Sequence, residues 1–194
     1  MKTKHQGKRI FITGIPTSGK SHLAKQLADK VNGVAVSLDN LRKNLAKNNR
    51  YKKWTNFYFS KDEYLYLTQT SHEEQWQHIV EQSNGLWPAF LQEIEKYKNE
   101  KKPVIFECAN ILPHLAKRDL DFPGIVLIGK TYEEILERNK KNPRWGATLE
   151  LQELEAKKLF EVERLRYKIE AEKYSYDVFE SSRVAFIKAF SLLI

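Results

Sequence analysis

Short apolar runs alternate along the chain with longer stretches in which apolar residues recur at helical spacing. The runs at 104–109 and 125–128 lack alternation, which predicts strands covered on both faces. Three further short runs predict strands at 8–13, 34–38 and 176–179. The predicted helices are 19–31, 40–49, 60–82, one that begins at Pro88, 131–141, 149–173 and 182–193.

This alternation predicts a doubly wound α/β fold, in which a five-stranded parallel sheet lies between two helical layers. A length of 194 residues fits one domain, 1–194, in which 50–100 is expected to form a helical insert. Ligands of such sheets bind at the carboxyl ends of the strands. The loop after the first strand, Asp39 after the second and Glu107 in the third are therefore expected at one edge.

Local signals predict where several helices begin and end. Ser60 and Glu63 have the spacing of a capping box, and Thr131 with Glu134 repeats it. Asn84-Gly85 is expected to end the helix 60–82, because glycine commonly follows a helix. Ser182 is expected to cap the last helix. The long helix 149–173 is expected to bury one stripe, made of Leu151, Leu154, Val162, Leu165 and Ile169.

Composition limits the class of protein. The chain is 41% hydrophobic and 12% aromatic, which is typical of a globular protein. Its one cysteine, Cys108, excludes an internal disulfide and fits a reducing compartment. The basic tail 1–7 leads into no long apolar run, so we expect a cytoplasmic protein without a membrane partner. The net charge of +8 suits polyanionic ligands, or serves solubility alone. No oligomeric state is predicted.

The most specific motif is the loop Gly14–Ser21, in which four residues separate two glycines and the second glycine begins the run Gly-Lys-Ser. Glycines allow backbone N–H groups to turn toward a phosphate, and the next helix adds its positive end. Lys20 can reach the outer phosphates, and the Ser21 hydroxyl can bind Mg²⁺. The alternative is a glycine turn that binds nothing. The expected nucleotide-binding residues here are Gly14, Pro16, Thr17, Ser18, Gly19, Lys20, Ser21 and His22.

Three charged residues follow or end predicted strands. Asp39 can accept a proton from a substrate hydroxyl or hold Mg²⁺ through water, and it can equally cap the helix that begins there. Arg42, one turn later, can clamp an anionic substrate or lie in solvent. Glu107 ends an apolar run, where an acid is costly unless it is paired or bound to a metal. We interpret it as a residue that holds Mg²⁺ or its water shell and that contacts the substrate.

Cations and aromatic residues mix in the segment 50–59. Trp54, Phe57, Tyr58 and Phe59 can line a substrate pocket or stack on bases. They can also simply pack a helical insert against the core. The sequence favours this second reading.

The phosphate loop, the Asp39-x-x-Arg42 pair, Glu107 and the arginines of 138–145 together resemble the P-loop kinases. The Asp-x-x-Arg spacing is similar to that of polynucleotide kinases. The segment Glu107–Pro113 is similar to the Glu-Gly-x-x-x-x-Pro segment of 2-phosphoglycerate-kinase-like proteins, with Cys108 in place of their glycine. The Asp-Gly-Tyr/Phe-Pro-Arg segment of many nucleoside monophosphate kinases is absent, which disfavours that substrate class.

The resemblance implies a kinase that uses ATP and Mg²⁺. Lys20, Asp39 and Arg144 would be catalytic, with Asp39 as general base and Arg42 holding a phosphate of the acceptor. The segment 138–150 would be a lid that carries Arg144 between Pro143 and Gly146. Two further arginines, Arg138 and Arg183, would lie near the adenine, and two more, Arg164 and Arg166, are reserve candidates for Arg144.

Two other functions remain open. A polynucleotide 5′-kinase would use the positive charge and the segment 50–59 to bind nucleic acid. A nucleotide-binding NTPase or switch would act through a partner, without a small acceptor.

Overall fold

The computed structural model describes residues 7–194, so all of the predicted basic tail except Gly7 lies outside the described residues. The first strand, β1, is central in a five-stranded parallel sheet of order β2-β3-β1-β4-β5. The strands are β1 (Arg9–Thr13), β2 (Val34–Ser37), β3 (Val104–Glu107), β4 (Gly124–Leu127) and β5 (Asp177–Phe179). This is the predicted three-layer α/β fold, with strand ends within two residues of those expected.

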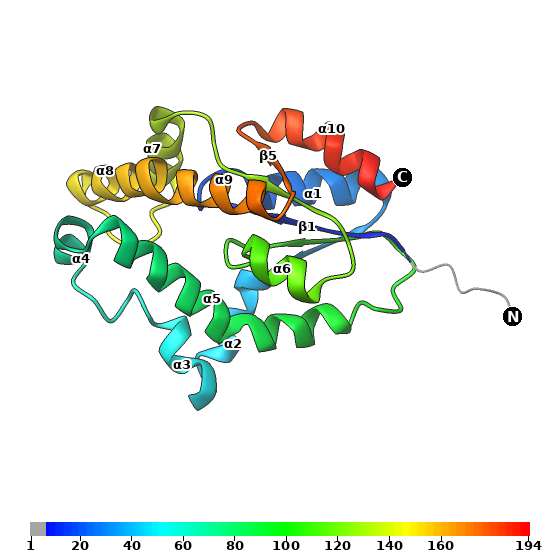
Figure 1. The fold of residues 1–194 in the computed structure, drawn as a ribbon, viewed down its shortest axis with the longest axis horizontal. Helices are drawn as coiled ribbons and strands as arrows, with labels where there is room; N and C mark the ends of the chain where they lie inside the picture. Colours follow the sequence, from blue (N-terminus) through cyan, green and yellow to red (C-terminus); the bar gives the residue numbers. More distant parts are fainter. Residues whose placement is uncertain (1–6) are drawn as a thin grey trace, which may run out of the picture.

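Alternate strand residues face two helical layers, because successive side chains of a strand point to opposite faces. Ile10 and Ile12 pack with α1 (Lys20–Val31) and α10 (Ser182–Leu193). Phe11 and Phe106 belong to the larger core on the other face, which α5 (His72–Glu95), α6 (Pro113–Asp119) and α9 (Arg164–Lys173) cover. Figure 1 shows α1 and α10 on one side of the sheet, with α5 and α6 on the other.

The strand register brings chemical groups to one edge. Glu107 pairs with Ile12 of β1 and with Ser37 of β2. The phosphate loop therefore leaves β1 beside the end of β3, and Asp39 follows the end of β2 one strand farther on. This is the juxtaposition that the strand pattern predicts.

The segment after β2 is shorter and more broken than the predicted helix 40–49. A 3₁₀ turn, η1 (Leu38–Leu41), leads into the single turn α2 (Arg42–Leu45). Two short helices follow, α3 (Asn49–Thr55) and α4 (Glu63–Gln69). Asp62 caps α4 by accepting from the Leu65 N–H at 2.9 Å, so the capping box predicted at Ser60 is wrong.

Helix α5 corrects the predicted break at 84–88. The capping box lies at Ser71 and Glu74, and the helix then continues for 24 residues through Gly85 and Pro88. Gly85 is needed for packing rather than for a stop, because a Cβ there would lie 2.3 Å from the Trp54 ring. A glycine in a sequence can therefore indicate that another side chain packs closely against the backbone, as well as the end of a helix.

The predicted long helix after residue 149 contains a π turn. It consists of α8 (Leu149–Lys158), the π turn η2 (Leu159–Glu163) and α9. The extra residue of the π turn rotates all that follows, so Leu165 and Ile169 of the predicted stripe are 53% and 50% exposed. Tyr167 and Ala171 are buried instead.

The remaining helix is α7 (Tyr132–Lys141), which Thr131 caps as predicted by accepting from the Glu134 N–H. The last helix is capped by Ser181, one residue before the predicted Ser182. Among residues 7–194, no helix has the length and apolar character needed to cross a membrane.

Candidate active site

The phosphate loop is held by close contacts that only glycine permits. Gly14 has φ 124°, and a Cβ there would lie 2.0 Å from the Leu127 carbonyl oxygen of β4. Gly19 has φ 97° at the start of α1, where L-residues are strained. The loop therefore rests directly on β4 and feeds a helix N-terminus, which is the geometry that binds phosphate.

Lys20 is the buried cation of this loop. It is 7% exposed, and its Nζ donates to the Ile15 carbonyl oxygen at 2.6 Å. Burial lowers the pKa of Lys20, although the nearby carboxylates of Glu107 and Asp39 oppose that change. Ser18 also donates to Ile15, at 2.8 Å. The amine thus lies inside the loop, with carboxylates on its far side.

The other predicted nucleotide contacts lie around this loop. Arg138 on α7 donates from Nη1 to the Thr17 carbonyl oxygen at 3.0 Å. Pro16, Thr17 and Ser21 line the cavity described below. His22 and Arg183 line a shallow depression between α1 and α10 instead.

Asp39 does not cap a helix. The residue before the 3₁₀ turn is Ser37, and no side-chain cap bond is made there. The Oδ1 of Asp39 accepts from Arg42 Nε at 2.9 Å and from Cys108 Sγ at 3.3 Å. Burial raises the pKa of Asp39, but Arg42 and then Lys20 outweigh it and hold that pKa below its ordinary value. Asp39 is therefore an ionised carboxylate that faces the cavity.

Arg42 is held in place and is not a solvated helix residue. Its Nη2 donates to Asn110 Oδ1, and Asn110 Nδ2 donates to Ser83 at 2.7 Å and to Gln82 at 3.2 Å. These bonds use both ends of the Asn110 amide, so the polar network is satisfied. It links the edge of β2 to α5. Sequence reasoning missed Asn110, which follows β3 by three residues in a segment noted only for its likeness to kinases.

Glu107 is 3% exposed at the end of β3 and lines the cavity together with Ser21. No group of three or more His, Cys, Asp or Glu that could hold a metal occurs among residues 7–194. Carboxylate and hydroxyl oxygens suit Mg²⁺, which commonly takes only one or two protein ligands and leaves the rest to phosphate and water. The donor set at Glu107 and Ser21 fits that mode of binding.

The segment after α7 lines part of the cavity with residues 142–145. Arg144 Nη1 lies 3.2 Å from Glu155 Oε1 of α8, and Trp145 packs against the rings of Tyr58 and Tyr66 at centroid distances of 5.8 and 5.7 Å. A Cβ on Gly146 would lie 2.3 Å from a carboxylate oxygen of Glu63. This segment therefore packs on α8 and on the residues between α3 and α5.

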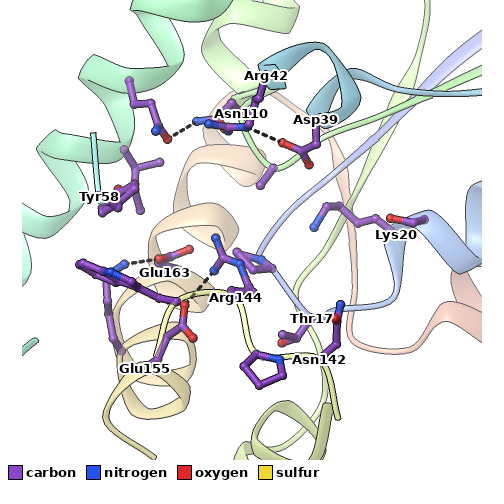
Figure 2. A pocket seen from close by; sticks show the side chains of 18 of the residues that line it. Thr17, Lys20, Asp39, Arg42, Tyr58, Asn110, Asn142, Arg144, Glu155 and Glu163 are labelled. Carbon is purple, nitrogen blue, oxygen red and sulfur yellow. Dashed lines mark hydrogen bonds and ion pairs between the residues drawn. The ribbon is translucent and has the colours of Figure 1, made fainter. Parts of the chain in front are cut away.

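One cavity of about 450 Å³ joins these groups. Figure 2 shows Lys20 and Asp39 on one side, with Tyr58 and Glu163 across from them. The aromatic segment 50–59 divides between the two readings, since Tyr58 and Phe59 line the cavity while Trp54 stacks on Phe57. Of the predicted reserve residues, Arg164 pairs with Glu180 and Arg166 with Glu73, and neither lines the cavity.

The wall opposite the phosphate loop was not predicted. Glu155, Lys158, Glu163 and Tyr167 of α8, η2 and α9 line it, and we call these four residues the helical wall. Lys158 Nζ lies 2.5 Å from Glu163 Oε1 with both side chains nearly buried. A buried ion pair in a helix does not appear in the pattern of apolar residues. The only indication in the sequence would have been a charged residue on the apolar face of the helix.

Comparison with solved structures identifies the fold. A shikimate kinase from Acinetobacter baumannii in complex with shikimate is 13% identical, covers 97% of this chain and 93% of its own, and has a TM-score of 0.51. The protein TT1252 from Thermus thermophilus (14% identity, coverage 97% and 99%) and an uncharacterized protein from Eubacterium ventriosum (14%, 97% and 98%) also have TM-scores of 0.51. The chain has the fold of the P-loop kinases.

At such identity the likeness concerns the fold alone. No protein-family model matches the chain, and no curated protein matches it in sequence.

Proposed function

We propose that this protein is an ATP-dependent kinase that transfers the γ-phosphoryl group to a hydroxyl of a small-molecule or nucleotide-like acceptor. The observation that carries the proposal is the convergence of Lys20, Asp39 and Arg144 on one cavity with the phosphate loop at its side. Phosphoryl transfer depends on positioning and on charge stabilisation, which these groups supply. The likeness in fold to a shikimate kinase agrees with this class of reaction.

In the proposed reaction the acceptor oxygen forms a bond to the γ-phosphorus, and the bond from that phosphorus to the β–γ bridging oxygen breaks. Asp39 orients the acceptor hydroxyl and takes its proton, and ADP leaves. Lys20 exchanges its bond to Ile15 for a phosphate oxygen. Mg²⁺ bound near Ser21 and Glu107 would neutralise charge on the phosphates. Arg144 would turn from Glu155 toward the transferring group as the lid closes.

The proposed adenine position lies outside the cavity, between Arg138 and the turn before α10. Arg138 lies over the loop through its bond to Thr17, and its planar guanidinium can stack on a base. A nucleotide-bound structure with the base far from Arg138 and Arg183 would contradict this placement.

The test is phosphate transfer from labelled ATP to a metabolite panel, with Lys20→Met as the key variant. Transfer should fall by about a hundredfold or more, because the variant lacks the positive charge that would contact the phosphates. The exposed Lys25→Met on the same helix is the matched control and should retain transfer. If folded Lys20→Met transfers phosphate like the parent, the proposal is wrong. If ATP is hydrolysed and no compound gains phosphate, the NTPase alternative replaces it.

A further inference from the structure

The π turn has a specific effect on the helical wall. Successive residues of an α-helix turn by about 100°, so side chains five apart point about 140° away from one another. Lys158 and Glu163 are five apart, and η2 is the turn between them. Because a π turn bonds residue i to i+5, it places the two side chains together on the cavity side. In an uninterrupted α-helix these two side chains would point to different faces.

The pair is also costly for the fold. Lys158 is 10% exposed and Glu163 5%, so both charges are largely withdrawn from water. Burying an ion pair often stabilises no more than apolar packing does, and π turns are rare and concentrate at functional sites. The Lys158 amine also lies 5.5 Å from the centroid of the Tyr58 ring. Because the buried pair adds little stability to the fold, it points to a role in binding a ligand.

Charge around the cavity is balanced, because its lining holds four cations (Lys20, Arg42, Arg144 and Lys158) and four carboxylates (Asp39, Glu107, Glu155 and Glu163). Arg42 pairs with Asp39, Arg144 with Glu155, and Lys158 with Glu163. Glu155 and Glu163 are both buried. An acceptor that carries phosphate or carboxylate groups would find no surplus cation here and would approach buried carboxylates, which is unfavourable. The net charge of +8 therefore does not extend to this wall.

We infer that the acceptor is an uncharged polyhydroxy compound, such as a sugar, a sugar alcohol or a nucleoside, whose hydroxyls bind Lys158 and Glu163. A hydroxyl both donates and accepts, so it can give a hydrogen bond to the carboxylate and take one from the ammonium group. Tyr58 lies beside the pair, lines the cavity and offers ring surface to the apolar face of such a compound. The inference rests on the proposed kinase function and names its substrate class.

The experiment is a transfer assay with Mg·ATP and four groups of acceptors. They are neutral sugars and polyols, neutral nucleosides, the phosphorylated or carboxylated analogues of both, and 5′-hydroxyl oligonucleotides. One of the two neutral groups should gain phosphate, and which one does so distinguishes sugar from nucleoside. Preference for an anionic analogue or an oligonucleotide overturns this inference and leaves the kinase function standing. Absence of transfer in every group overturns both.

The variant Glu163→Gln then tests the wall itself. It leaves Lys158 unpaired, so KM for the neutral acceptor should rise about tenfold or more, while KM for ATP stays within about twofold. Activity toward anionic analogues should rise at the same time, which a purely structural role would not cause. Exposed neighbours provide the matched controls Glu161→Gln and Lys157→Met, which should match the parent.

Because a lone buried cation can unfold the protein, the double variant Lys158→Met/Glu163→Gln is measured beside it. This variant removes both charges and should remain folded, with the same rise in acceptor KM. An unchanged KM for the neutral acceptor in the folded double variant overturns the inference.

Discussion

At the scale of single residues, Asp39 shows how neighbours prepare a carboxylate for its task. Arg42 and Lys20 outweigh the effect of burial and keep the pKa of Asp39 low. A low pKa makes Asp39 a weak base at rest but keeps it ionised, and so able to orient a hydroxyl. Arg42 is fixed in turn by Asn110, which bonds to α5. The pKa of Asp39 is therefore set in part by Arg42, which Asn110 holds in place from the other side.

Replacing this carboxylate tests its role. Asp39→Asn should lower kcat by about a hundredfold or more, since an amide cannot take the proton. ATP affinity, measured by calorimetry, should be largely kept. A variant with normal kcat that merely melts earlier would show that Asp39 only supports the fold.

The pH profile gives the same residue a second readout. A carboxylate with a lowered pKa stays ionised until the pH falls below its ordinary value of 3.8, so the acid limb due to Asp39 lies below that pH. Removing Arg42 as Arg42→Met should raise the pKa and move this limb to higher pH. Exposed Lys43→Met serves as the control and should leave the limb in place.

At the scale of elements, the sequence predicted those features that a short motif or the order of the strands determines. The phosphate loop and the acids at strand ends were predicted, because a motif and the sheet topology fix them. The prediction that Gly85 ends a helix was wrong. A glycine is needed there because the Trp54 ring, 31 residues earlier in the chain, leaves no room for a side chain. The helical wall was missed, because one π turn decides which side chains of α9 face inward. Periodicity assumes an uninterrupted 3.6-residue repeat and cannot detect such a change.

In helix α5, the sign of the change in stability on replacing Gly85 distinguishes helix propensity from packing. By helix propensity alone, Gly85→Ala should stabilise the protein by about 1 kcal/mol. The contact with Trp54 predicts the reverse, a loss of about 1–3 kcal/mol through overpacking. Chemical denaturation measures the difference. The exposed Glu81→Ala on the same helix should change stability by no more than about 0.5 kcal/mol.

The segment after α7 gives another test at this scale. If it closes as a lid, Arg144→Ala should cut kcat by about a hundredfold while ATP binding changes little, because the guanidinium would serve the transition state. Lys140→Ala, exposed on the neighbouring turn, is the control. A kcat within about twofold of the parent would remove Arg144 from the mechanism.

At the scale of the whole molecule, ligand binding and stability are linked. Mg·ATP at about a hundred times its Kd should add about 2.7 kcal/mol to the free energy of unfolding. For a domain of this size that raises Tm by about 5–10 °C. Thermal melting with and without Mg·ATP measures the shift, and Lys20→Met should lose most of it. No shift at saturating nucleotide would argue against a nucleotide site.

The strand order also affects how the chain folds during synthesis. Of the five described strands, β1 is synthesised before the others, yet its neighbours in the sheet are β3 and β4, which follow by roughly a hundred residues. At about 5–20 residues per second of synthesis, β1 waits roughly 5–20 s for them. Gly14 of the phosphate loop lies against Leu127, so the loop has all of its contacts only after β4 has been made. During that interval the apolar strand β1 lacks its partners in the sheet, and unpaired apolar strands are prone to aggregation.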